Sequence, residues 1–135
     1  MDIWEIDEKL PNGLHDALIH NISIDYVQRE LKFDMEIHVG DPEAPTEAER
    51  EAYKNARLKL KGFHYCVIEP PDQNYPFLKK EPLWIDLGNM EKLRSSSKVT
   101  LPDNIPEDAF TFRIFVVDWN SFIYVSATEA EFSWI

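Results

Sequence analysis

The feature that most constrains the fold is a segment of strict alternation at residues 31–39. Apolar residues occupy the odd positions and polar or charged residues the even ones: Leu31, Phe33, Met35, Ile37 and Val39 against Lys32, Asp34, Glu36 and His38. A period of two places successive side chains on opposite faces of a β-strand. One face against a core and one in water is typical of antiparallel sheets, so the chain is expected to build such a sheet.

The segment before it, residues 18–25, predicts the partner strand. Every second residue from Leu18 to Ile24 shares one parity, His20 included, which predicts that this set faces the core. The residues between the two segments have the length of a hairpin connection, so the strands are expected to pair. On this prediction His20 lies on the apolar face and His38 on the polar face, and the two imidazoles diverge.

Further strand signals follow along the chain. A third strand that opens at Arg57 changes parity at Gly62, which predicts a bulge or sharp bend there. The remaining strands are expected at residues 83–87, 110–117 and 122–125, the last two forming a hairpin. Thr46 and Glu49 have capping-box spacing, which predicts one short helix near 46–55.

These elements predict a single all-β domain over residues 1–135. The expected architecture is a mostly antiparallel sandwich or half-open barrel of about six strands with one short helix. A chain of 135 residues with 44% hydrophobic residues is enough for one core.

Charge and cysteine content exclude several classes of protein. The formal net charge of −11 disfavours nucleic acid and anionic membranes as partners and favours a basic protein surface. Cys66 is the single cysteine, so an internal disulfide and a multi-cysteine zinc site are excluded. The acidic start of the chain does not resemble a signal peptide, and no stretch is apolar enough for a membrane span, so a cytoplasmic protein is expected.

The negative charge is unevenly divided along the chain. Residues 1–50 hold 13 acids and 4 bases, residues 51–100 hold 6 acids and 9 bases, and residues 101–135 hold 6 acids and one base. The net charges of the three parts are therefore −9, +3 and −5. This division predicts one acidic side of the molecule, on the first hairpin and at residues 41–51.

The adjacent pair His15 and Asp16 is the first candidate site. A carboxylate beside an imidazole can orient a general base or share a metal ion, whereas the competing interpretation is that one of the two caps the Asn12-Gly13 turn. Neighbours in a regular strand point to opposite faces, so the two can cooperate only if the backbone is irregular there. The four histidines show no close-spaced metal motif, and no metal, cofactor or catalytic residue is predicted.

Other candidates are binding residues. Asp34 and Glu36 share the polar face of one strand, although a solvated row is the simpler interpretation. Trp119, at the tip of the C-terminal hairpin, and Tyr75, in a proline-rich loop, are aromatic candidates for contact with an Arg- or Lys-rich partner. The alternative is that these aromatic residues close the ends of the core.

Within about the first 65 residues, Gly13-Leu14-His15-Asp16-Ala17 precedes two strands and a later Leu-Lys-Leu-Lys-Gly-Phe stretch. This arrangement resembles a group of small bacterial proteins of immunity-protein or uncharacterised β-rich type. The resemblance implies a cytoplasmic protein that binds and blocks a toxin.

The leading functional hypothesis is therefore a non-enzymatic acidic binding protein with a basic partner. A small-ligand-binding or hydrolytic β domain that uses His15 and Asp16 is the first alternative, and it requires these side chains, with His64, to converge on one cavity. A subunit that self-associates through a strand edge is the second alternative.

Overall fold

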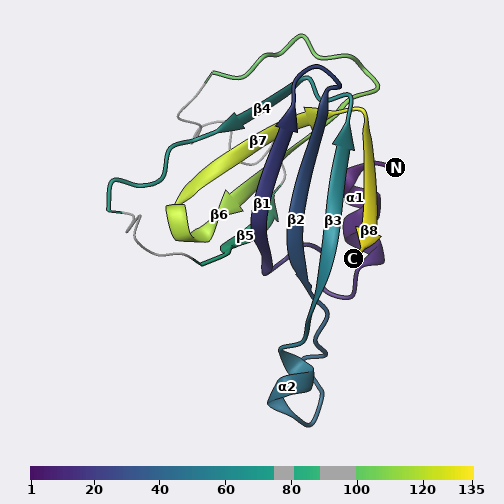
Figure 1. Cartoon of the computed structure of the whole chain (residues 1–135), viewed down its shortest axis with the longest axis vertical. Helices are drawn as coiled ribbons and strands as arrows, with labels where there is room; N and C mark the ends of the chain where they lie inside the picture. Colours follow the sequence, from purple (N-terminus) through teal and green to yellow (C-terminus); the bar gives the residue numbers. More distant parts are fainter. Residues whose placement is uncertain (75–80, 89–99) are drawn as a thin grey trace.

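The protein forms one antiparallel sheet of eight strands (Figure 1). The computed structural model describes residues 1–74, 81–88 and 100–135. The strands are β1 (Ala17–Asp25), β2 (Glu30–His38), β3 (Tyr53–Lys61), β4 (Tyr65–Ile68), β5 (Leu83–Gly88), β6 (Phe110–Val116), β7 (Ser121–Ala127) and β8 (Glu129–Trp134). Their order in the sheet is β4-β7-β6-β5-β1-β2-β3-β8. The predicted all-β class is confirmed, with eight strands in place of about six.

The sheet curls because two chain segments bend together at one corner. Thr128 alone separates β7 from β8, although these strands lie toward opposite ends of the sheet, and residues 62–64 join β3 to β4 in the same way. Gly62 has φ +60°, which favours glycine, and Thr128 donates backbone and hydroxyl hydrogen bonds to the Lys61 carbonyl at 3.1 and 3.2 Å. The bend predicted at Gly62 is confirmed, and the curled sheet is a barrel that does not close.

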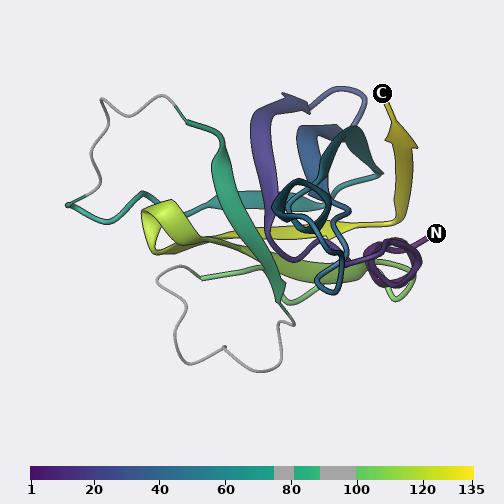
Figure 2. The same cartoon turned by 90° about the horizontal axis from the view of Figure 1, so that it is seen from below.

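The core fills the inside of this curl. The alternating residues of β2 are buried on one face as predicted, and they pack with apolar side chains from the other strands, Phe63 and Phe112 among them. A helix that the sequence did not predict, α1 (Ile3–Lys9), adds Ile3 and Ile6 to this core. It lies beside β8 (Figure 2), and Asp2 caps it by accepting a hydrogen bond from the Glu5 N–H.

The expected facing of His20 is wrong. The register between β1 and β2 shifts between Ile19 and Asn21, so that His20 is the extra residue of a bulge. Ala17 and Ile19 are buried before the bulge, whereas Ile22 packs against the core after it. One inserted residue thus reverses the parity of the strand, and His20 lies on the outer face.

The predicted helix near 46–55 is shorter than expected. The structure has α2 (Glu47–Arg50), capped by the Thr46 hydroxyl, with no buried residue. It projects beyond the ends of β2 and β3 (Figure 1), and β3 already begins at Tyr53. The pairing of these strands extends by one hydrogen bond, from the Val39 N–H to the Ala52 carbonyl at 2.9 Å. This bond holds Glu51 close to the first residue of β3.

Candidate functional site: an acidic groove beside His15

The turn that enters β1 is held in place from outside itself. Asp7 of α1 accepts the Leu14 N–H at 2.7 Å, and the Asn12 side-chain amide donates to the His38 and Gly40 carbonyls at 3.0 and 2.9 Å. Because these groups fix the turn, neither His15 nor Asp16 has to cap it. The printed side-chain contacts of His15 and Asp16 are instead with each other, with Asp86 and with Trp84.

Asp16 connects four surrounding groups. Its φ is +59°, a left-handed conformation that aspartate tolerates better than most residues, and this is the irregular backbone that cooperation with His15 requires. Its N–H donates to Asp86 at 3.2 Å and its carbonyl accepts the Tyr53 hydroxyl at 3.1 Å. Its carboxylate accepts the indole N–H of Trp84 at 2.8 Å and lies 3.3 Å from His15 Nε2.

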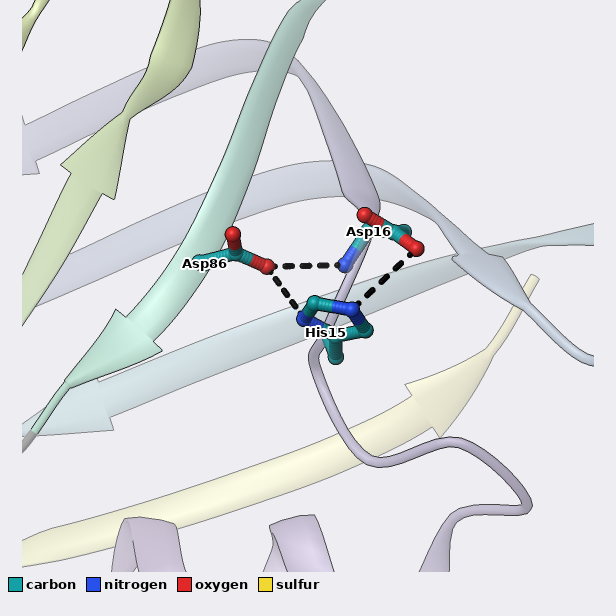
Figure 3. Close-up of side chains that lie close together, drawn as sticks. All are labelled: His15, Asp16 and Asp86. Atoms are coloured by element: carbon teal, nitrogen blue, oxygen red, sulfur yellow. Dashed lines mark hydrogen bonds and ion pairs between the residues drawn. The ribbon is translucent and has the colours of Figure 1, made fainter.

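His15 lies between two carboxylates (Figure 3). Its Nδ1 is 2.5 Å from Oδ1 of Asp86 on β5, and its Nε2 faces Asp16. Ligand atoms of the three residues all lie within 4.8 Å of one another, so they could hold a metal ion. A carboxylate on one imidazole nitrogen is also the arrangement that orients a metal-ligating or base histidine. The His15 side chain is, however, 67% exposed.

Next to this cluster the surface is hollowed into a groove of about 840 Å³. Its lining joins the start of β1, the start of β3, the start of β5 and the turn after β6. The polar lining consists of four carboxylates, two aromatic residues and one histidine: Asp16, Glu51, Glu81, Asp118, Tyr53, Trp84 and His38. We call this feature the acidic groove, and no lysine or arginine is among its described lining residues.

Trp84 and Tyr53 form the aromatic walls of the acidic groove. The backbone N–H of Trp84 donates to Asp118 Oδ2 at 2.9 Å and its indole N–H to Asp16, so both the main chain and the ring are held while the residue remains 44% exposed. Burial raises the pKa of the Tyr53 hydroxyl, and the negative charges of Asp16, Glu36 and Glu51 raise it further. The Tyr53 hydroxyl therefore lies in a negative electrostatic field.

Asp34 and Glu36 are placed on the outer face of β2 as predicted, but each has a cationic or imidazole partner. Asp34 accepts a hydrogen bond from Arg57 Nε at 2.8 Å, and Glu36 lies 2.7 Å from His20 Nε2. Lys59 and Lys61 form further ion pairs with Glu30 and Glu131. The outer face of the first hairpin is therefore one of mixed charge, whereas the groove gathers four carboxylates.

Of the two aromatic candidates, the structure describes only Trp119. Trp119 belongs to the 3-10 turn η3 (Val117–Trp119) and is partly buried against the core, as in the alternative that these aromatic residues close its ends. Tyr75 lies outside the described residues.

His64 and Cys66 do not join His15. The His64 carbonyl accepts a hydrogen bond from Arg29, at the end of the β1–β2 hairpin opposite to His15. The convergence required of His64 is thus not found, whereas His15 and Asp16 do converge. Burial raises the pKa of the Cys66 thiol to about 11, which leaves little of the thiolate that nucleophilic catalysis needs.

Sequence reasoning missed Asp86, Trp84, Tyr53 and Asp118, whereas Glu51 lies within residues 41–51, where an acidic surface is predicted. The one local signal was an aspartate within the apolar strand at residues 83–87, where a charge needs a partner. The other residues come together only through strand pairing, which brings Trp84 opposite Leu18 and Tyr53 opposite His38.

Comparison with protein-family models, with curated proteins and with solved structures finds no match for this chain. No helix within the described ranges is long and apolar enough to cross a bilayer. Function must therefore be inferred from the geometry of the molecule itself.

Proposed function

We propose that this protein is a non-enzymatic, acidic binding protein of the cytoplasm whose partner is a basic protein surface, and that by occupying that surface it blocks the partner, as immunity-type proteins do. The observation that carries the proposal is the acidic groove. It combines a concave surface, four carboxylates with no lysine or arginine among the described lining residues, and an exposed tryptophan, which is the combination that binds cationic side chains.

Electrostatics give the partner its expected behaviour. A negative concave surface raises the rate of encounter with a basic protein and rejects acidic ones, and added salt weakens this attraction. The outer face of β2 and β3 offers a weaker negative field, because Asp34 and Glu30 already pair with Arg57 and Lys59.

The test is affinity capture from an extract of the source cells with the full chain, with the captured proteins identified by mass spectrometry at low and high salt. Glu51 is exposed and lines the groove, so Glu51→Lys is the informative variant. Glu43→Lys makes the same charge change at an exposed position of the same loop outside the groove. We expect a basic protein that wild type and Glu43→Lys retain at low salt and that Glu51→Lys loses. Equal capture by all three would refute the proposal.

A second function, a small-ligand-binding or hydrolytic domain, is supported by the convergence of His15, Asp16 and Asp86. Zinc ions are bound by imidazole and carboxylate in this combination. Calorimetric titration with Zn²⁺ tests it, and His15→Ala is expected to abolish the binding. Absence of binding to the wild-type chain would remove the metal-dependent form of this alternative.

A further inference from the structure

The acidic groove has the features of a site for a planar cation. Its tryptophan is held rigidly, since Asp16 fixes the indole N–H and Asp118 fixes the backbone N–H. A preorganised ring costs a ligand little ordering entropy when it stacks. The groove therefore presents a flat aromatic surface before any partner arrives.

The fold already places cations over other aromatic rings. Arg29 lies 4.6 Å from the centroid of Phe63, and Lys54 lies 5.6 Å from that of Trp134. Within the described part of the chain, no such cation is found over Trp84. Trp84 is also 44% exposed, so a cation from another molecule can reach its ring.

We propose that the acidic groove binds one arginine side chain of the partner. Its guanidinium stacks on the indole of Trp84 and donates hydrogen bonds to the carboxylates of Glu51 and Asp16. This inference rests on the proposed function, because it names the group by which the basic partner is recognised.

Arginine fits this site better than lysine for two reasons. A guanidinium is planar, so it can lie flat on an indole and still direct paired N–H groups outward, in its own plane, at a carboxylate beyond the edge of the ring. An ammonium is a compact and strongly hydrated charge that gains less from a flat aromatic wall. The carboxylate of Asp16, which accepts the indole N–H at the edge of the Trp84 ring, and that of Glu51, which lines the same groove, suit the first geometry.

The test uses three synthetic peptides, acetyl-Gly-Gly-X-Gly-Gly-amide, in which X is arginine, lysine or citrulline. Binding to the full chain is followed through the indole N–H resonance of Trp84 in ¹H–¹⁵N spectra. We expect a saturable shift with the arginine peptide, binding about fivefold weaker with the lysine peptide, and no shift with neutral citrulline. Equal affinity of the arginine and citrulline peptides, or of the arginine and lysine peptides, would overturn the inference.

Two tryptophan variants locate the site. Trp84→Leu should lose most of its affinity for the arginine peptide. Binding to this variant is followed through the backbone resonances of the other groove residues. Trp134→Leu is the matched control, because Trp134 is similarly exposed at 48% on an outer strand, and it should bind as wild type does. If the peptides fail to discriminate while Glu51→Lys still loses the captured protein, the arginine inference falls and the proposed function stands.

Discussion

At the scale of single residues, Asp16 organises the candidate site. Its backbone N–H, its carbonyl and its carboxylate contact Asp86, Tyr53, Trp84 and His15. The left-handed backbone at φ +59° is what lets one residue face all of them. The adjacency of His15 and Asp16 in the sequence thus matters through backbone conformation rather than through strand parity.

Replacing Asp16 should separate its backbone role from its side-chain role. Asp16→Ala loses the hydrogen bond from Trp84 and places a Cβ-bearing apolar residue in a left-handed conformation, which together should cost about 2 kcal/mol of unfolding free energy. Asp16→Asn should lose less than half of that, because its amide oxygen can accept the indole N–H and asparagine tolerates this conformation. Urea unfolding monitored by circular dichroism measures both.

Asp16→Gly provides the control for this pair of variants. Glycine removes the side chain and relieves the positive φ, so it should be more stable than Asp16→Ala. A glycine variant less stable than the alanine variant would show that backbone strain is not part of the effect.

Cys66 should be an unreactive thiol in the folded protein. Its pKa of about 11, compared with an ordinary value of 9.0, means about 100-fold less thiolate at pH 8, and alkylation by iodoacetamide should be slowed accordingly. The same reaction in denaturant gives the reference rate, and equal rates in the two conditions would contradict the prediction.

The same shift in pKa sets a pH dependence of stability. The folded state keeps the Cys66 proton after the unfolded state has lost it, so this thiol's contribution is complete below pH 9 and declines between pH 9 and about 11. Cys66→Ser lacks an ionising thiol, so its stability should fall less than that of wild type across this window.

At the scale of elements, the corner between Lys61 and Thr128 decides how the sheet curls. A Cβ on Gly62 would lie 2.3 Å from the Thr128 hydroxyl oxygen, in addition to the strain of φ +60°. Gly62→Ala should therefore destabilise the protein by about 2–4 kcal/mol, measured by thermal or urea unfolding. The double variant with Thr128→Ala should recover the part due to the clash. A Gly62→Ala variant as stable as wild type would contradict this account of the corner.

The sequence predicts strands well wherever one face is buried and the other is solvated. The β2 alternation and the break at Gly62 are local properties, and both are confirmed. The predicted orientation of the His20 side chain is wrong because a bulge inserts one residue without changing the local composition. Helix α1 was missed because seven residues with two buried isoleucines carry too short a periodic signal.

The candidate site was only half predictable for a different reason. His15 and Asp16 are visible as neighbours in the chain, whereas Trp84 reaches them through pairing of β5 with β1, and Glu51 returns through the β2–β3 ladder. Contacts of this kind depend on strand order, which periodicity does not contain. Trp119, the tryptophan favoured from the sequence, packs against the core, whereas Trp84 and Trp134 are exposed.

At the scale of the whole molecule, the ion pairs, rather than the positions of acids in the sequence, decide which surface carries most of the net charge of −11. The basic residues of β3 pair with carboxylates on both neighbouring strands, since Arg57 and Lys59 face Asp34 and Glu30 of β2, and Lys61 faces Glu131 of β8. The carboxylates of the groove have no such lysine or arginine among the described lining residues. A sheet that places bases on one strand thus leaves its acidic surface at the end where β1, β3 and β5 begin.

The two edges of the sheet bear on the alternative of self-association. An open strand edge offers unpaired N–H and C=O groups to a second copy. On β8, however, the Met1 carbonyl accepts the Ala130 N–H at 2.7 Å, and Glu129 and Glu131 are exposed along the same strand. The other edge strand, β4, has only four residues. Both are features that natural sheets use to prevent edge-to-edge pairing.

The protein should therefore sediment as a monomer, and sedimentation velocity over a wide range of concentration measures this. Glu131→Thr removes a charge from the β8 edge, together with its ion pair with Lys61. This variant should therefore associate at a lower concentration than wild type does. A wild-type sedimentation coefficient that rises with concentration would favour the self-associating subunit over the binding protein. A monomer at every concentration leaves the acidic groove free to be filled by a different protein, as the proposed function requires.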